Sequence, residues 1–263
     1  MAALSTSCSD FLDTVPKDQL APSTTWQTEA DAKGFIVGCY KDLLDGNTLL
    51  YLDCGSDIGY NNFPWEGFRP WGDGSLSSSN PGQILYDYKS IRKANTFLEN
   101  VDKVTFSSDA VKANYVAQAK AIRAYKYFLM NWWYGGVPII TEVQEPVESS
   151  VTPRSSAKDC FDFICNDLEK AETMLAPFTG AGQWMTGDNY GRVTSGTAVA
   201  LLGRVRLLYA SPLFNRSNDE NRWKQAYTDI KRSIDVLAAA GYGLANETPG
   251  TNASNWAKIF TEV

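Results

Sequence analysis

AKAIRAYKYFLMNWWYGGVPIITE, at residues 119–142, is the stretch that decides the fold, because it joins a helical pattern to a chemically specified stop. Around it, apolar and aromatic residues recur every three or four positions, at Val111, Tyr115, Ala119, Ile122, Tyr125, Leu129 and Trp132. This spacing gathers side chains on one face of an α-helix, and that face requires a partner. Gly135 or Gly136 can take the left-handed conformation that closes a helix, and Pro138 prevents the helix from resuming.

The composition is that of a globular, acidic chain. With 263 residues, of which 44% are hydrophobic, the chain can bury a substantial core. A formal net charge of -6 and the lack of a basic run argue against a nucleic-acid partner. The chain has no histidine, which excludes Ser-His-Asp and Cys-His catalysis and histidine zinc sites. No segment approaches the roughly 20 consecutive apolar residues of a membrane span, so membrane association would need an anchor.

Six segments combine helical periodicity with capping residues. We expect the helices to begin near Thr28, after Gly82, and near Ser108, Ser156, Thr194 and Asp219. The third and fourth helices, and the fifth and sixth, have apolar faces too wide to leave in water, so they should stack as pairs. Such pairs resemble tetratricopeptide units in architecture, without the strict repeat. The sequence therefore predicts an all-α fold, a TPR-like superhelix of helical pairs, in which any sheet is small and peripheral.

A long irregular segment, residues 45–80, interrupts the helices and is far longer than an ordinary connection. It mixes aromatic residues with carboxylate, amide and guanidinium side chains. A pyranose ring presents an apolar face of C–H groups and a rim of hydroxyls, which such a mixture suits. We expect a ligand-binding loop in which the residues that contact the ligand are Trp65 and Trp71 as stacking platforms and Asp57, Asn61 and Arg69 as hydroxyl partners.

Other aromatic residues have structural interpretations. Some residues of the loop, above all Tyr51 and Phe63, are expected to pin it to the helical body. Trp132 and Trp133 are adjacent on one helix and therefore point about 100° apart. We expect these two residues to pack in the core.

The five cysteines divide into one candidate lipid attachment point and four thiols. Cys8 follows small residues, although Leu4 lies one place too far away for a good lipobox. Cys160 and Cys165 share a predicted helix and point in poorly matched directions for a disulfide, and Cys39 lies on an apolar helical face. We expect these cysteines and Cys54 to be free thiols.

Four segments together resemble the SusD/RagB family, surface lipoproteins of Bacteroidetes that capture glycans for a TonB-dependent transporter. The helix that ends in GGVP carries most of the likeness. The family's order and rough spacing are also shown by CSDFLD at 8–13, IRKANTFLENVDKV at 91–104 and GRVTSGTAVALLGRVRLLYASP at 191–212. The resemblance covers most of the chain.

This resemblance implies a non-catalytic protein that captures an oligosaccharide or polysaccharide for import through a SusC-like transporter. It implies a surface-exposed position on the outer membrane through lipid on Cys8. We expect no cofactor and assign no metal ligand. Residues 1–22 would be the lipoprotein N-terminus and tether, and residues 23–263 the SusD-like helical body. Only seven residues precede Cys8, and family members are longer than this chain. We therefore expect the sequence to be incomplete at its start and to lack a C-terminal half.

Two other functions remain open at this point. A helical-repeat scaffold could bind a protein or peptide, with the loop as its partner surface. A glycoside hydrolase could use two of the carboxylates Glu142, Glu145 and Glu148, although solvated charge is the default explanation for them. Asp53 and Asp57 could join a calcium site, but the EF-hand spacing is absent.

Overall fold

The computed structural model describes residues 25–41, 43, 51–144, 152–175 and 189–242. Within these ranges the chain forms helices and no strand, and Thr28 and Thr105 pair in an isolated parallel bridge. The α-helices are α2 (Glu29–Tyr40), α4 (Arg69–Asp73), α5 (Tyr88–Asn100), α6 (Asp109–Tyr134), α8 (Ala157–Leu175), α9 (Ser195–Ala210) and α10 (Glu220–Ala239). Short 3-10 helices are η2 (Leu52–Gly55) and η3 (Val101–Lys103). The all-α prediction is confirmed.

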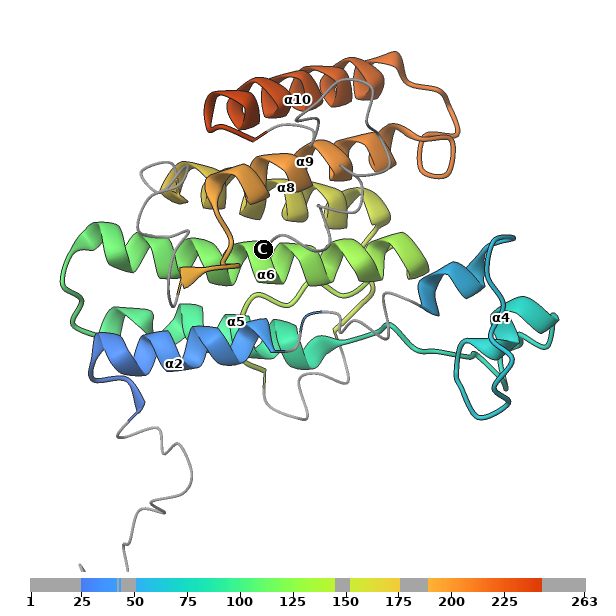
Figure 1. Ribbon diagram of the computed structural model, residues 1–263, viewed down its shortest axis with the longest axis horizontal. Helices are drawn as coiled ribbons and strands as arrows, with labels where there is room; N and C mark the ends of the chain where they lie inside the picture. The colour runs from blue at the N-terminus through green and yellow to red at the C-terminus, as the bar shows by residue number, and fades with distance from the viewer. Residues whose placement is uncertain (1–24, 42, 44–50, 145–151, 176–188, 243–263) are drawn as a thin grey trace, which may run out of the picture.

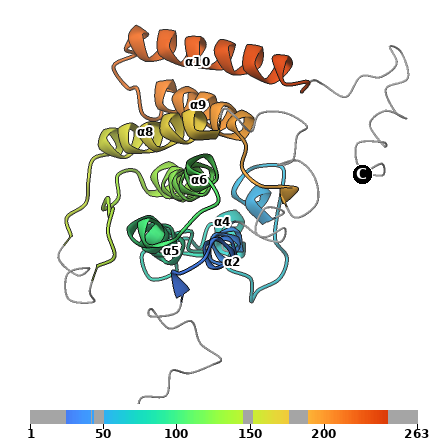
Figure 2. The same cartoon turned by 90° about the vertical axis from the view of Figure 1, so that its left-hand side faces the viewer.

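The helices stack in successive layers around α6 (Figure 1). Figure 2 shows α8 on one side of α6, with α5 and α2 on the other side. α9 packs on α8, and α10 packs on α9 as the outer layer. The loop that carries α4 lies beside the C-terminal end of α6 (Figure 1). The end of α6 is therefore where the irregular loop meets the helical stack.

The core fills clusters on both faces of α6. One cluster joins α6 to α8 and α9 through Tyr127, Phe161 and Leu202. Another joins α6 to α2 and α5, and includes Ile36 and Phe97. Burying one such side chain contributes roughly 1.5–3 kcal/mol relative to leaving it exposed. Ile122 of the expected apolar face lies in the second cluster, whereas Tyr127 in the first cluster lies outside that face, so α6 is buried on more than the one face that the sequence predicted.

Most helix starts lie at the predicted capping residues. At α2, the Thr28 hydroxyl accepts from the Asp31 N–H at 3.2 Å, and the Asp31 carboxylate accepts from the Thr28 N–H at 2.8 Å. This reciprocal arrangement is a capping box. Side-chain oxygens also cap the starts of α6, α8, α9 and α10, at Ser108, Ser156, Thr194 and Asp219.

The end of α6 follows the prediction from the sequence. Gly135 has φ +73°, a conformation that side-chain-bearing residues rarely adopt. Its N–H donates to the Asn131 carbonyl oxygen at 3.0 Å. The Arg154 guanidinium donates to the carbonyl oxygens of Tyr134 and Gly136, which would otherwise lack partners at a helix end.

The predicted start of the second helix is wrong. Instead of following Gly82, α5 begins at Tyr88, and Ile84 is 60% exposed in a segment without regular secondary structure. Asp87 is the cap, since its carboxylate accepts from the N–H groups of Lys89 at 2.9 Å and Ser90 at 3.4 Å. The apolar spacing of the sequence already begins upstream of Asp87, so spacing alone does not reveal this cap.

Four cysteines of the described residues are buried thiols, as predicted: Cys39, Cys54, Cys160 and Cys165. Burial raises the pKa of the Cys165 thiol to about 12. Cys8 and the predicted tether, residues 1–22, lie outside the described residues. The irregular loop contains short helical turns, η2 and α4, that the sequence did not predict.

Candidate functional site

Aromatic side chains gather where the loop meets the C-terminal end of α6. The ring centroids of Trp71 and Trp133 lie 4.9 Å apart, with 38° between the ring planes. Phe68 contacts Trp71 edge-on at 5.0 Å, and Trp132 stacks beside Trp133 at 5.9 Å. Two segments far apart in the sequence thus build one continuous aromatic surface.

Close backbone approach at two glycines fixes the position of Trp71. A Cβ atom on Gly55 would lie 2.9 Å from Cε3 of the indole, and one on Gly82 would lie 2.6 Å from Nε1. Gly82 also has φ +66°, in the left-handed region that favours glycine. The indole is therefore held between η2 and the segment before α5.

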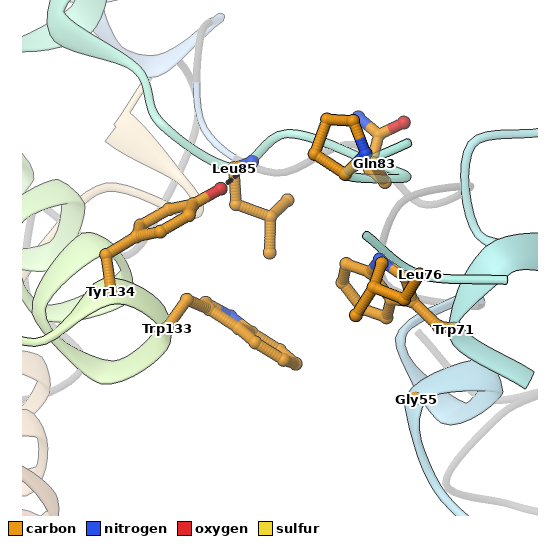
Figure 3. Close-up of a pocket in the computed structure, with 8 residues that line it drawn as sticks. Gly55, Trp71, Leu76, Gln83, Leu85, Trp133 and Tyr134 are labelled. Carbon is orange, nitrogen blue, oxygen red and sulfur yellow. Dashed lines mark hydrogen bonds between the residues drawn. The ribbon is translucent and has the colours of Figure 1, made fainter. Parts of the chain in front are cut away.

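Tyr134 anchors the segment before α5 to the end of α6. Its hydroxyl oxygen accepts a hydrogen bond from the Leu85 N–H at 2.9 Å. The Tyr86 ring packs edge-on against Tyr134 at 5.4 Å, and the Tyr88 hydroxyl donates to the Pro138 carbonyl oxygen at 2.5 Å. These contacts place Leu85 opposite the tryptophan rings (Figure 3).

The aromatic surface forms one wall of a cavity of about 280 Å³, which we call the Trp71 cavity (Figure 3). Its lining residues are Gly55, Trp71, Leu76, Pro81, Gln83, Leu85, Trp133 and Tyr134. The Gln83 amide and the Tyr134 hydroxyl are polar groups in a lining that is otherwise largely apolar. Small-molecule sites commonly have this composition.

A second cavity, of about 400 Å³, adjoins the first through shared lining residues and is called here the Arg204 cavity. The shared residues are Gly55, Leu85 and Trp133. The remaining lining residues are Leu52, Asp53, Ser56, Tyr125, Phe128, Leu129, Trp132 and Arg204. Trp133 is therefore common to two adjoining hollows at the same end of the stack.

Among the described residues that line the Arg204 cavity, Arg204 is the cation and Asp53 the carboxylate. The guanidinium carbon of Arg204 lies 6.0 Å from the Trp132 ring centroid, near the outer limit of a cation–π contact. Burial raises the pKa of Tyr125, and the positive charge of Arg204 lowers it in part. Asp53 is exposed on η2. The Arg204 cavity therefore combines aromatic rings with an exposed guanidinium and an exposed carboxylate.

The two tryptophans predicted as platforms lie in different surroundings. Trp71 lines the Trp71 cavity. Trp65 is 76% exposed and packs on Phe63 at 5.2 Å between ring centroids. Tyr51 packs on Phe68 at 5.6 Å, within the same loop. Of the predicted platforms, only Trp71 lies beside the aromatic end of α6.

The predicted hydroxyl partners lie outside the linings of both cavities. Asn61 is 2% exposed, and its side-chain oxygen accepts from the Phe63 N–H at 2.9 Å. Arg69 pairs with Asp73, at 3.3 Å between Nε and Oδ2. Asp57 is exposed. A ligand role for Asp57, Asn61 and Arg69 stays a prediction.

The prediction that Trp132 and Trp133 pack in the core is wrong. They are 36% and 39% exposed, whereas Asn131 just before them is fully buried. The last turn of α6 extends past its buried part and meets the loop instead. The signal was present in the sequence, because three consecutive aromatic residues, Trp132, Trp133 and Tyr134, cannot share one buried helical face.

The residues that suggested a hydrolase or a metal site do not form such a site within the described part of the chain. Glu142 is exposed, whereas Glu145 and Glu148 lie outside the described residues. The residues that the structure describes contain no group of three or more side chains placed to hold a metal. Among the same residues, no helix is both long and apolar enough to cross a bilayer.

The fold and the two cavities define a helical-stack protein with an aromatic hollow at one end. Residues 10–207 match the SusD-like family model described as "Starch-binding associating with outer membrane". The chain belongs to this SusD-like family.

Relatives in sequence are similar over part of their length. SusD-like protein P25 of Formosa agariphila is 29% identical over 65% of this chain and 35% of its own. A SusD-like protein of Bacteroides ovatus is 28% identical over 78% of this chain and 37% of its own. The chain thus spans about a third of the length of these relatives.

Solved structures of the family share the fold. A SusD-like protein from Bacteroides fragilis matches 94% of this chain and 44% of its own, with a TM-score of 0.70 and 25% identity. A laminarin-binding SusD-like protein matches 69% of this chain and 40% of its own, with a TM-score of 0.60 and 25% identity.

Proposed function

We propose that this protein is a surface glycan-binding protein, and that the Trp71 cavity is where it binds an oligosaccharide. The observation that carries the proposal is the Trp71–Trp133 pair, with ring centroids 4.9 Å apart at the wall of a cavity. Family membership and the laminarin-binding relative support it.

The chemistry of the Trp71 cavity suits a sugar. The apolar face of a pyranose ring can stack on an indole, and its hydroxyls need fixed polar partners. At this separation and inclination the Trp71 and Trp133 rings pack partly on each other, so a pyranose ring would stack on the outward face of one of them. Gln83 and Tyr134 also line the cavity, and the Tyr134 hydroxyl, which accepts from the Leu85 N–H, still has a proton to donate to a sugar hydroxyl.

We keep the other loop residues in the proposal as outer contacts. Trp65 is exposed on the same loop, and Asp57 and Arg69 lie near it in sequence, whereas the buried Asn61 would act indirectly by holding the loop backbone at Phe63. A longer glycan that leaves the Trp71 cavity over the loop could reach Trp65. The expected order of importance is therefore Trp71 first and these four residues after it.

Membrane association and delivery complete the proposal. Lipid on Cys8 would hold residues 1–22 as a tether to the outer membrane, and residues 23–263 would form the helical body. A TonB-dependent SusC-like transporter would receive the glycan. The family's association with the outer membrane supports this. The antiparallel helix pairs α6–α8 and α9–α10 support the TPR-like description of the body.

We propose binding without catalysis and without a cofactor. Glycoside hydrolysis commonly needs two carboxylates on opposite sides of the scissile bond. Among the described residues that line the two cavities, Asp53 supplies the one carboxylate. A peptide-binding scaffold has less support, because the aromatic and polar residues that line the cavities between the loop and α6 suit a sugar.

A glycan array probed with the purified chain tests the binding proposal. We expect retention on oligosaccharides by the parent and loss of that retention in Trp133→Ala. An array that stays blank, together with recovery of a protein partner in a pull-down, would replace the proposal with the scaffold. Release of reducing sugar would replace it with the hydrolase.

Expression of the protein in its native host, followed by separation of the membrane and soluble fractions, tests the anchor. Cys8→Ala should move the protein from the membrane fraction to the soluble fraction. Co-purification of a TonB-dependent transporter with the parent would support delivery. Unchanged membrane association of Cys8→Ala would overturn the anchor and leave glycan binding untouched.

A further inference from the structure

Arg204 and Arg206 both lie on α9, but their guanidinium groups have different partners. Arg206 is paired with Glu169 at 3.0 Å and with Asp229 at 3.2 Å, so its charge holds α8, α9 and α10 together. Arg204 is exposed, and no carboxylate of the described residues pairs with it. Its guanidinium instead faces the Trp132 ring and the cavity that it lines.

The surroundings of Arg204 suit a sugar that carries an acid. Trp132 and Trp133 supply stacked indole rings, 5.9 Å apart and inclined by 22°, on which a pyranose ring can rest. A guanidinium presents a planar fork of donors that matches a carboxylate or a sulfate. We infer that the Arg204 cavity binds the anionic group of an acidic sugar, so that the captured glycan is a uronate-containing or sulfated one. This inference rests on the proposed function.

Asp53 is the charged group that opposes this assignment. It comes from η2, whereas Arg204 comes from α9, so the two charges reach the cavity from different elements. A bound acidic sugar would direct its acid to Arg204 and a hydroxyl to Asp53, since a carboxylate accepts from hydroxyls. The opposite charges would then fix one orientation of the sugar.

Paired probes test the inference on the full chain. One arm uses a uronate oligosaccharide and its uncharged methyl ester, and the other uses a sulfated oligosaccharide and its desulfated form. We expect the parent to prefer the acidic member of one pair, and which pair it is identifies the acid. Added salt should weaken binding of that member more than of its uncharged counterpart.

Variants identify the residue responsible. Arg204→Gln should weaken binding of the acidic member by about tenfold or more, the effect of losing a hydrogen bond to a charged group. The uncharged counterpart should lose less. Arg204→Lys keeps the charge without the fork, so its affinity for the acidic member should lie between those of the parent and Arg204→Gln. Asp53→Asn keeps an oxygen that accepts from the sugar hydroxyl and removes the repelling charge, so it should tighten acidic binding. Arg216→Gln is the matched control, because Arg216 is exposed and lines neither cavity.

The outcomes separate this inference from the proposed function. Binding of uncharged glycans alone, unchanged by Arg204→Gln, would overturn the inference and leave glycan binding standing. An acidic preference that Arg216→Gln abolishes as fully as Arg204→Gln would also overturn it, because the effect would be one of net charge. Failure to bind any glycan would overturn the proposed function and the inference together.

Discussion

Arg123 on α6 and Asp167 on α8 form a bidentate ion pair inside the stack, at 2.8 Å between Nε and Oδ2 and 3.1 Å between Nη2 and Oδ1. Their side chains are 6% and 1% exposed. Arg123 also donates to the Asn95 side-chain oxygen at 2.8 Å, and Asn95 donates to the carbonyl oxygens of Ile140 and Glu142. One buried network thus joins α5, α6, α8 and the segment after GGVP.

The first prediction concerns this network. Asp167→Asn should lower the free energy of unfolding by about 3–5 kcal/mol, because removing one partner leaves the buried Arg123 charge uncompensated. Urea denaturation measures the change. Asp162→Asn is the control, since Asp162 pairs with Lys158 on the exposed surface of the same helix and should leave the urea midpoint in place. Equal midpoints for both variants would contradict the account.

The second prediction concerns the backbone after α6. A Cβ on Gly136 would lie 1.9 Å from the Ser155 carbonyl oxygen, so Gly136→Ala must displace backbone. We expect a loss of about 1–3 kcal/mol in unfolding free energy, the usual effect of overpacking. Gly34→Ala should instead stabilise the protein by about 0.5–1 kcal/mol, because Gly34 is exposed in α2 with no atom within 4 Å of an added Cβ. Thermal melts that rank the two variants in the opposite order would refute this.

The third prediction concerns the reactivity of Cys165. Its pKa is raised by burial to about 12, so little thiolate exists at pH 8. Iodoacetamide should leave Cys165 unlabelled in the folded protein and label it in urea, as peptide mass spectrometry would show. As the pH rises from 9.0 towards about 12, the unfolded chain releases this proton first, so stability should fall over that range. Equal labelling rates in buffer and in urea would argue that the thiol is accessible.

The sequence predicted the helical body well because local patterns specify it. The capping pair of Thr28 and Asp31 and the GGVP stop act within a few residues of themselves. Asp87 was missed because apolar residues upstream, such as Ile84, continue the helical spacing without being helical. A cap inside a periodic run cannot be separated from the run by spacing alone.

The site was harder to predict because it depends on tertiary contacts. The sequence indicates Trp71 as a stacking platform, which stays a prediction, and the structure places Trp71 in the lining of a cavity, whereas its partner Trp133 was expected to pack in the core. Their contact requires close backbone approach at Gly55 and Gly82, which brings the loop onto the end of α6. Nothing in the spacing of the loop residues encodes this approach. Arg204 was missed for the same reason, since it comes from a distant helix.

The central claim is that Trp71 and Trp133 bind the glycan. Calorimetry of Trp71→Ala and Trp133→Ala, against an oligosaccharide identified on the array, tests it most directly. A stacked aromatic lost from such a site should cost about 2 kcal/mol or more, and therefore more than tenfold in affinity. Trp223→Ala is the control, because Trp223 on α10 is 38% exposed, much as Trp133 is at 39%, and lines neither cavity.

Thermal melts of the same samples separate binding from folding. The account predicts that both cavity variants lose more than tenfold in affinity while they melt close to the parent, and that Trp223→Ala binds like the parent. Parent-like affinity in both Trp71→Ala and Trp133→Ala would contradict it. So would affinity losses that only accompany melting many degrees lower, because these tryptophans would then be structural.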